Sequence, residues 1–245
     1  MDEQNSSITI CLAGVPVRYV FRYPGTKRYF TRFQCAEQAQ AEVLSVTDEI
    51  WERHRNVAET SISDEYAEFY ALLGITSRTL LRHGKCLFHG AAFVWRGKAW
   101  IITAPSGTGK TTQLRLWEKL YGNEISLING DKPVIECRSD ETMWVYPSPW
   151  NGKENLFGTA SGKLGGIIVL EQAGHNEMQR MSVRECMIPI YRQFLYYGDY
   201  ENEISAVGHM QDVILRNIPV WKLRNLGDAA SAALTHDALL RYLEE

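Results

Sequence analysis

The sequence predicts an α/β protein that has a mixed β-sheet with helices on its faces and a small β-rich N-terminal part. Three observations favour this fold class. Apolar runs that read as a hairpin precede a glycine-rich loop, an amphipathic helix follows that loop at once, and further helical segments gather late in the chain. We therefore expect a β-rich part over residues 1–60 and a core over residues 61–245.

Length and composition indicate a sizeable buried core and limit the partners. The chain has 245 residues, of which 45% are hydrophobic, and its net charge is -3 at pH 7. This charge gives no uniform basic field, so no nucleic-acid partner is predicted. The start "MDEQNSS" is acidic and polar, and no apolar run approaches the length of a membrane span. We expect a cytoplasmic protein with no membrane partner.

The five cysteines are scattered and form no C-x-x-C pair. Such spacing suits neither a disulfide framework nor a tetrahedral zinc site. We expect reduced thiols, most of them buried.

Residues 8–46 are rich in β-branched and aromatic side chains, which favour strands. The stretch "YPGT" at residues 23–26 indicates a turn between two such runs. This N-terminal part could bind a substrate, complete the core or mediate a homo-oligomer, and the sequence leaves these alternatives open.

Residues 61–84 predict the first long helix of the core. Ser61 stands three positions before Asp64, a pattern typical of a helix N-terminus, and apolar residues then recur along one helical face. Gly84 is the expected stop of this helix.

Residues 91–104, "AAFVWRGKAWIITA", predict a hairpin that turns at Arg96 and Gly97, and residues 111–122 predict the helix after the glycine-rich loop. Later strands are expected at "EISLI" (124–128), "VIEC" (134–137), "MWVY" (143–146), "GGIIVLE" (165–171) and "VWKL" (220–223), and later helices at residues 182–197, 202–217 and 228–245.

The glycine-rich loop "APSGTGKT" at residues 104–111 matches the nucleotide-binding pattern G-x-x-x-x-G-K-[ST], except that Ala104 replaces the first glycine. The glycines let backbone N–H groups turn toward phosphate oxygens at a helix N-terminus. Lys110 would reach the β- and γ-phosphates, and the Thr111 hydroxyl would bind Mg²⁺. The predicted phosphate-binding residues are Ser106, Gly107, Thr108, Gly109, Lys110, Thr111 and Thr112. The alternative is an ordinary glycine and serine turn before a helix.

The predicted nucleotide is ATP. A guanine-binding Asn-Lys-x-Asp motif is absent, because "NGDK" at residues 129–132 has those letters in another order.

Two acids compete for the residue that orients or deprotonates a nucleophile. Asp131 follows the strand "SLIN", where a carboxylate could project toward the γ-phosphate, although Gly-Asp pairs are also ordinary turn residues. Glu171 ends an apolar strand, a pattern typical of the water-holding or magnesium-holding acid of many ATPases, but also of the first solvated residue after a buried strand.

Two further segments are candidates. The loop "PSPWNGKENLFG" at residues 147–158 contains Lys153, which could steady phosphate charge, and Glu154, which could bind Mg²⁺; the alternative is a rigid turn over a buried tryptophan. His89 lies just before the hairpin in the sequence. It could approach the γ-phosphate, or it could be a hydrogen-bonded structural residue.

The order of these motifs resembles the HPr kinase/phosphorylase and phosphoenolpyruvate carboxykinase superfamily. The resemblance rests on "FHG", the hairpin, "PSGTGKTT" and the acid after the next strand, over residues 86–172, and on the closing segment "VWKLRNLGDAASAALTHDALL". It implies a P-loop kinase core that transfers phosphate to a serine-type hydroxyl. It also implies that Asp131 is the base, that His89 assists it and that Ser106 to Thr111 hold the phosphates.

The chain departs from that family in two respects. HPr kinases have two adjacent acids where this chain has Gly130 and Asp131, so the role of the second acid is unfilled and the reverse, phosphorylase reaction is not predicted. Glu154 is the candidate for the metal role of the family's glutamate segment. The long carboxykinases use substrate-binding residues that are not found here, so decarboxylation is not predicted either.

The resemblance and the loop together predict an ATP- and Mg²⁺-dependent kinase. Its expected acceptor is a serine-containing peptide, a protein or a small molecule, and small members of the group act on peptides or amino acids. Two alternatives remain. One is an ATP-binding regulatory switch without phosphoryl transfer, and the other is simple ATP hydrolysis with Glu171 polarising water.

Overall fold

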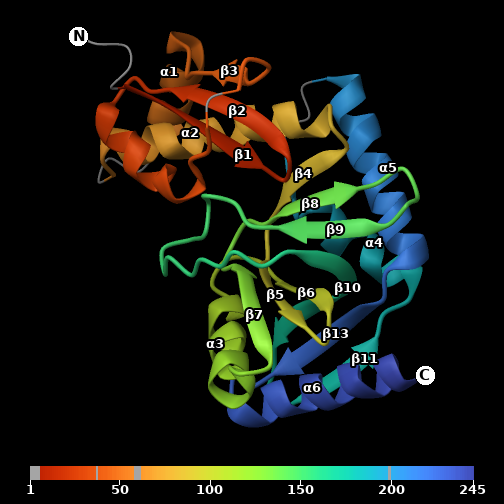
Figure 1. Cartoon of the computed structure of the whole chain (residues 1–245). Coiled ribbons are helices and arrows are strands. Elements are labelled where there is room, and N and C mark those ends of the chain that lie inside the picture. The colour runs from red at the N-terminus through yellow and green to blue at the C-terminus, as the bar shows by residue number, and fades with distance from the viewer. Residues whose placement is uncertain (1–5, 37, 58–61, 198–199) are drawn as a thin grey trace.

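A computed structural model of the chain describes residues 6–36, 38–57, 62–197 and 200–245. Within these residues the strands form a three-stranded sheet and a ten-stranded mixed sheet, and helices pack on the larger one (Figure 1). The expected α/β class with a mixed sheet is therefore confirmed. No helix in the described part of the chain is both long and apolar enough to cross a membrane. The cytoplasmic location remains a prediction.

The N-terminal sheet contains β1 (Ser7–Leu12), β2 (Val15–Val20) and β3 (Glu42–Leu44). β1 and β2 are antiparallel and are joined by a two-residue turn in which Ala13 and Gly14 both have positive φ, as a tight hairpin requires. β3 pairs parallel with β2.

The expected turn at residues 23–26 is present, since the backbone N–H of Thr26 donates to the carbonyl oxygen of Tyr23 at 2.9 Å. It does not lead into a second strand, however, but into a 3-10 helix, η2 (Pro24–Tyr29). Pro24 fits the first turn of a helix because its missing N–H has no partner to lose there. The short η3 (Thr31–Phe33) and α1 (Asp48–Val57) complete this part. A domain boundary near residue 60 remains a prediction.

α2 (Asp64–Leu81) begins at a serine cap. The Ser63 hydroxyl accepts a hydrogen bond from the backbone N–H of Tyr66 at 3.3 Å. The predicted cap, Ser61, lies outside the described residues. The chain turns at Gly84, whose φ of +67° is a conformation that favours glycine, as expected for the stop of this helix.

The large sheet is held together by one long strand, β10. At its start β10 pairs antiparallel with β9, and further along it pairs parallel with β6 on one side and with β13 on the other. The strands are β4 (Lys85–Phe88), β5 (Ala91–Trp95), β6 (Lys98–Thr103), β7 (Ile125–Asn129), β8 (Val134–Cys137), β9 (Met143–Tyr146), β10 (Gly162–Gln172), β11 (Glu177–Arg180), β12 (Phe194–Leu195) and β13 (Val220–Asn225).

The predicted hairpin at residues 91–104 is confirmed. β5 and β6 are antiparallel, and the turn residues Arg96 and Gly97 both have positive φ. β6 then runs directly into the glycine-rich loop, so the hairpin fixes where that loop starts.

The later helices are α3 (Lys110–Tyr121), α4 (Val183–Tyr191), α5 (Glu201–Asn217) and α6 (Ala229–Glu244). The helix expected over residues 182–197 is too long. α4 ends soon after Pro189, which removes a backbone donor, and residues Phe194–Leu195 pair with β4 as β12 instead. Pairing with a distant strand thus overrides the local apolar pattern.

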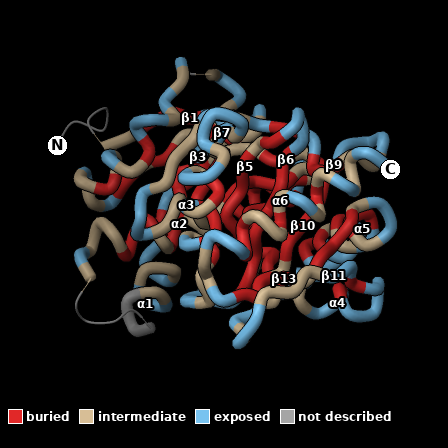
Figure 2. Tube along the Cα trace, turned by 90° about the horizontal axis from the view of Figure 1, so that it is seen from below, coloured by how far each residue is buried: buried red, intermediate tan, exposed pale blue. Residues whose placement is uncertain are grey.

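Buried side chains form three clusters that define the layers. On one side of the sheet, Trp100 and Trp117 pack between β5, β6, β10 and β13 and the helices α3 and α6. On another, Ile101 and Phe88 pack against α4 and α5. Figure 2 shows the buried residues concentrated along β5, β6 and β10.

The third cluster joins the N-terminal part to the core. Leu87 of β4 and Val134 of β8 are buried together with residues of β1, β2 and α2, and Trp150 of the 147–158 loop is buried in the same cluster. The N-terminal sheet therefore lies against the edge of the molecule where the strand ends of β4 and β7 meet that loop (Figure 1).

Candidate active site

The glycine-rich loop connects the end of β6 at Thr103 to the start of α3 at Lys110, as the sequence predicts. Gly107 and Gly109 have φ values of +80° and +108°, and a Cβ atom at either would meet no other atom within 4 Å. These positions therefore favour glycine because of their backbone conformation and not because of crowding. Ala104 is buried and is not among the residues with positive φ, which explains why alanine is tolerated at the first position of the pattern.

Lys110 is buried at the first turn of α3, with an exposed fraction of 7%. Its Nζ donates hydrogen bonds to the carbonyl oxygens of Ala104 at 3.0 Å and Pro105 at 3.4 Å. Burial lowers the pKa of this amine, while the negative charge of Asp131 partly opposes that shift. The ammonium thus lies folded against the loop that a phosphate would contact.

Asp131 follows the end of β7 and is held by two basic side chains. Its Oδ1 lies 3.4 Å from His89 Nε2, and its Oδ2 forms an ion pair with Lys132 Nζ. Burial alone would raise the pKa of this carboxyl, but the interaction with His89 and the charge of Lys132 outweigh burial and lower the pKa to about 2. Asp131 is therefore a carboxylate at neutral pH.

His89 is oriented from both sides of its ring. Nε2 faces Asp131, and Nδ1 lies 3.2 Å from the side-chain Oε1 of Gln193. The amide nitrogen of Gln193 donates to the carbonyl oxygen of Pro189, which fixes which end of the amide faces the histidine. The His89 carbonyl also accepts a hydrogen bond from Thr103 at the end of β6. His89 is thus tied to the strand that leads into the glycine-rich loop.

Asn129 is a site residue that the sequence did not reveal. Its side chain is fully buried, and its Oδ1 accepts hydrogen bonds from the backbone N–H groups of Asp131 at 2.8 Å and Lys132 at 2.7 Å. Its Nδ2 donates to the carbonyl oxygen of Ser148 at 2.9 Å. The signal was present in "NGDK", because an Asn side chain often accepts a hydrogen bond from the backbone N–H group two residues after it.

Gly130, which precedes Asp131, occupies a crowded position. A Cβ atom there would lie 2.7 Å from Leu156 Cβ and 3.0 Å from the carbonyl oxygens of Asn151 and Leu156. A side chain of any kind is therefore excluded unless the 147–158 loop shifts. Gly152 of the same loop packs directly against Asp131, with no room for a side chain toward it.

These segments surround one cleft of about 570 Å³. The cleft brings together the predicted residues His89, Ser106, Gly107, Thr111, Asp131, Lys153 and Glu154. Other residues that line it are Tyr70, Gly130, Lys132, Asn151, Gly152 and Leu195. The loop that would hold phosphate and the acid that would meet a nucleophile thus face the same space.

The oxygen donors of the cleft fit a magnesium ion that arrives with a nucleotide. Among the described residues, no group of three or more His, Cys, Asp and Glu side chains could hold a metal by itself. Thr111, Asp131 and Glu154 nevertheless line the cleft with hard oxygen atoms, and Mg²⁺ takes its other ligands from phosphates and water. Glu154 is half exposed and forms an ion pair with Arg115 of α3.

Of the other predicted loop residues, the buried Lys110 lines neither this cleft nor a second one, which three of them face. Thr108, Gly109 and Thr112 line a space of about 330 Å³ together with residues at the ends of β10 and β13, among them Gln172 and Asn225. The glycine-rich loop therefore separates two clefts, and only the first contains Asp131.

Glu171 lies outside both of these clefts. Its carboxylate instead lies 3.2 Å from Arg224 Nε and 3.9 Å from Lys222 Nζ, both on the neighbouring strand β13. This position matches a solvated residue at a strand end more than a water-polarising acid.

Comparisons with known proteins add little to this geometry. No protein-family model matches the sequence, and no curated protein matches it. Among solved structures, the chain is similar to the Hpr(Ser) kinase/phosphatase from Coxiella burnetii, with 13% sequence identity and a TM-score of 0.36 over 64% of this chain and 95% of that chain. A similarity this low carries no functional inference, so the chemistry has to come from the residues of the cleft.

Proposed function

We propose that this protein is an ATP-dependent kinase that transfers the γ-phosphoryl group to a serine-type hydroxyl of a peptide, a protein or a small molecule. The observation that carries the proposal is the shared cleft, in which Thr111 of the glycine-rich loop and the ionised Asp131 face the same space. The first feature suits phosphate and the second suits a hydroxyl nucleophile.

The loop and Lys110 would bind the phosphates. Backbone N–H groups at the start of α3 favour anions, and the buried ammonium of Lys110 needs to move only from the loop carbonyls to the phosphate oxygens. Because the γ-phosphate must face Asp131, the nucleoside must leave the loop on the opposite side. The second cleft, near Thr112 and Asn225, offers that space.

Asp131 would orient the acceptor hydroxyl toward the γ-phosphorus. The acceptor oxygen forms a bond to this phosphorus while the bond to the oxygen of the β-phosphate breaks, and ADP leaves with that electron pair. The hydroxyl proton passes to the carboxylate. A carboxylate with a pKa of about 2 is a weak base, so orientation is its main contribution and the proton moves late. His89 would keep the carboxylate in place.

Magnesium would be held by the phosphates, the Thr111 hydroxyl and Glu154. When bound, the ion supplies positive charge that neutralises the transferring phosphoryl group. Lys132 already forms an ion pair with Asp131, and the exposed Lys153 lies at the same cleft, so both could add positive charge near the phosphates.

The decisive experiment is mass spectrometry of hydroxyl acceptors incubated with the protein, ATP and Mg²⁺. The acceptors are serine-containing and serine-ending peptides and small hydroxyl compounds. We expect an added phosphoryl group on at least one acceptor, and a loss of about 100-fold or more in rate for Asp131→Asn with nucleotide affinity retained. Asp212→Asn, an exposed acid on α5, is the matched control and should keep the full rate.

Each other outcome contradicts part of the proposal. An unchanged phosphoryl-transfer rate in Asp131→Asn would show that Asp131 does not orient the acceptor hydroxyl. Nucleotide binding with no acceptor modified would favour the regulatory switch. ADP release that no acceptor changes would indicate hydrolysis.

A further inference from the structure

A third cleft lies beside the candidate active site and reaches the N-terminal part. This cleft has a volume of about 310 Å³ and shares Tyr70, Asn151, Gly152 and Lys153 with the cleft that contains Asp131. Its far end is lined by η2 and η3, at Arg28, Tyr29, Arg32 and Phe33. The two clefts are therefore adjacent, and we call them together the acceptor groove.

Packed aromatic rings line the acceptor groove. Tyr29 stacks on Phe69 with ring centroids 4.5 Å apart, and Tyr66 and Tyr70 meet edge to face at 4.9 Å. Phe69 in turn stacks on the buried Trp150. Because these rings cover one another, they offer edges and hydroxyl groups and few free ring faces. Base stacking needs free faces, so the lining suits a peptide more than a nucleic acid.

The charged side chains that line the third cleft, the outer end of the acceptor groove, are all positive. Arg28, Arg32 and Lys153 are exposed and line the cleft, whereas no Asp or Glu lines it. Within the described residues, none of these three cations has a carboxylate within ion-pair distance, although the hydrogen bond with Tyr29 and the more distant charge of Glu65 both raise the pKa of Arg28. Arg28 instead lies over the ring of Tyr29 and Arg32 over the ring of Phe157, at 4.9 and 5.3 Å from the ring centroids.

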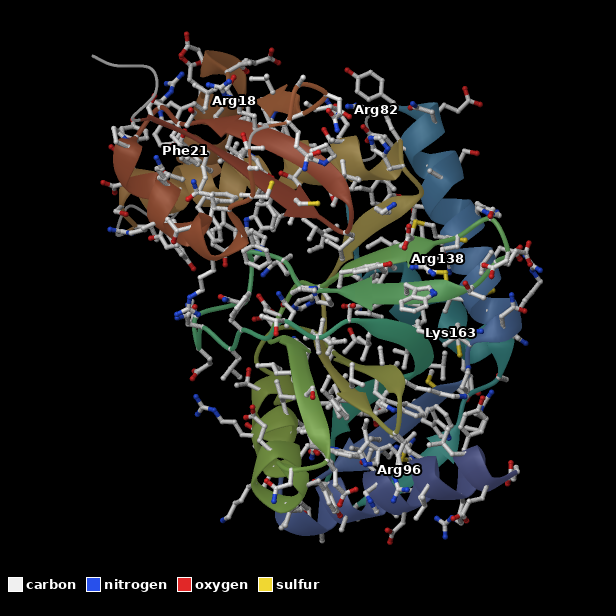
Figure 3. The ribbon with its side chains drawn as sticks, viewed as in Figure 1. Arg18, Phe21, Arg82, Arg96, Arg138 and Lys163 are labelled. Carbon is white, nitrogen blue, oxygen red and sulfur yellow. The ribbon has the colours of Figure 1, made fainter. Side chains whose placement is uncertain are left out.

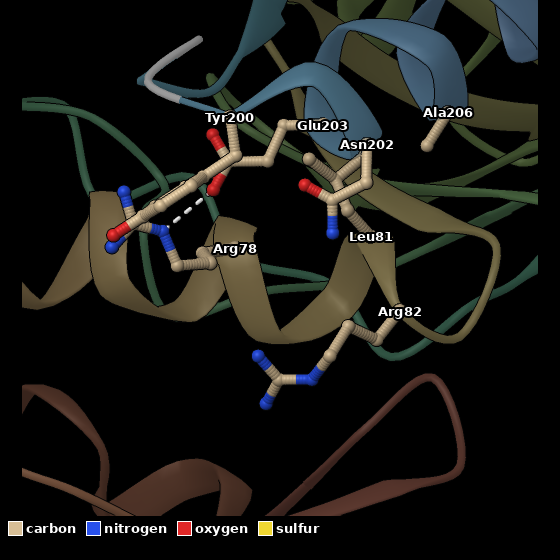
Figure 4. A pocket seen from close by; sticks show the side chains of 7 residues that line it. All are labelled: Arg78, Leu81, Arg82, Tyr200, Asn202, Glu203 and Ala206. Atoms are coloured by element: carbon tan, nitrogen blue, oxygen red, sulfur yellow. Dashed lines mark hydrogen bonds and ion pairs between the residues drawn. The ribbon is translucent and has the colours of Figure 1, made fainter.

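A different cleft contains arginines that form ion pairs within the chain. Between α2 and α5, Arg78 Nε donates to Glu203 at 2.6 Å, and Glu203 is almost fully buried (Figure 4). Arg82 of the same cleft forms an ion pair with Glu42. Both cations there form an ion pair within the chain, whereas in the described residues Arg28, Arg32 and Lys153 form none.

We propose that the acceptor groove binds an acidic peptide segment whose serine-type hydroxyl reaches Asp131. This inference rests on the proposed kinase function. The three cations would contact Asp or Glu side chains next to the acceptor residue, and the aromatic edges would contact the peptide backbone and apolar side chains. The substrate is thus a peptide or an extended protein segment with carboxylates beside its serine.

Peptide binding to the whole protein tests this proposal without ATP. The probes are fluorescent ten-residue peptides with one serine, flanked by Asp and Glu, by Ala and Gln, or by Lys, and the measurement is fluorescence anisotropy. We expect the acidic peptide to bind about ten-fold more tightly than the neutral one, and the basic peptide to bind least. Arg28→Gln and Arg32→Gln should each weaken the binding of the acidic peptide by about two- to five-fold and leave the binding of the neutral peptide unchanged.

Lys163→Gln is the matched control, because Lys163 is an exposed cation on β10 that does not line the acceptor groove (Figure 3). It should bind every peptide as the unmodified protein does. Thermal unfolding of each variant checks that the fold is intact.

Two results would overturn the proposal: equal binding of acidic and neutral peptides, or no effect of either arginine substitution. An oligothymidylate of ten nucleotides that binds more tightly than the acidic peptide would also overturn it and assign the groove to nucleic acid. Failure of the kinase function gives a different result, in which the acidic peptide binds through Arg28 and Arg32 but gains no phosphoryl group with ATP.

Discussion

His89 and Asp131, which follow the ends of β4 and β7, are linked through both side chain and backbone. Nε2 of His89 lies 3.4 Å from Oδ1 of Asp131, and the backbone N–H of Gly90 donates to the carbonyl oxygen of Asp131 at 2.8 Å. The carboxylate is thus fixed before any substrate binds. Such preorganisation is what a residue that orients a nucleophile needs.

The pKa of Asp131 predicts how stability depends on pH. The pKa falls from 3.8 to about 2 on folding, so the ionised form stabilises the folded state by about 2 kcal/mol above about pH 5. This contribution is lost as the pH falls below about 4 toward the folded pKa. In urea unfolding, the difference in unfolding free energy between the unmodified protein and Asp131→Asn should be constant from about pH 8 to 5 and shrink below that. A difference that stays constant to about pH 3 would contradict the pKa assignment.

Asn129 predicts a loss of both stability and transfer. Asn129→Ala leaves two partly buried backbone N–H groups and the Ser148 carbonyl without this partner, so we expect the free energy of unfolding to fall by about 2–4 kcal/mol. The phosphoryl-transfer rate should fall too, because the backbone of Asp131 is no longer held. Urea unfolding and rate measurements test this. The exposed Asn202→Ala on α5 should change stability by less than about 0.5 kcal/mol, and an equal loss there would show that the effect is not specific to Asn129.

Local sequence signals sufficed for the hairpin and the position of the glycine-rich loop. Arg96 and Gly97 set the β5–β6 turn, and Gly107 and Gly109 supply the positive φ values that the loop requires. These features depend on neighbouring residues only, which is why a pattern could predict them. The roles of the loop residues in nucleotide binding remain predictions.

Contacts between distant segments were beyond such patterns. Gln193 reaches His89 because the chain leaves α4 early to pair β12 with β4, although the apolar residues of this stretch have a helical periodicity. The acceptor groove was equally hidden, because it combines η2 and η3 with α2 and the 147–158 loop. Burial of Trp150 beneath Phe69 brings these segments together, and no spacing in the sequence indicates that contact.

Gly130 predicts a steric limit at the site. Gly130→Ala places a Cβ atom within 3.0 Å of two backbone oxygens and closer still to Leu156, so we expect a loss of about 1–3 kcal/mol in the free energy of unfolding. Gly208→Ala is the matched control, since a Cβ atom there meets nothing within 4 Å and the residue lies inside α5. That variant should be more stable by about 0.5–1 kcal/mol. The prediction fails if Gly130→Ala unfolds at the same urea concentration as the unmodified protein.

Replacing Lys110 tests whether the loop binds nucleotide at all. In the described chain, the only hydrogen bonds that its Nζ donates go to carbonyl oxygens of the loop. Lys110→Met should therefore leave the fold of the nucleotide-free protein intact, while it removes the positive charge that would contact the phosphates. With Mg²⁺ and ATP at about 100 times the dissociation constant, the unmodified protein should gain about 2.7 kcal/mol and about 5–10 °C in Tm. Lys110→Met should gain less than about 2 °C, whereas Lys119→Met, an exposed cation on the same helix, should show the full shift. A full ATP shift in Lys110→Met would mean that phosphate does not bind at this loop, and the proposed kinase function would lose its basis.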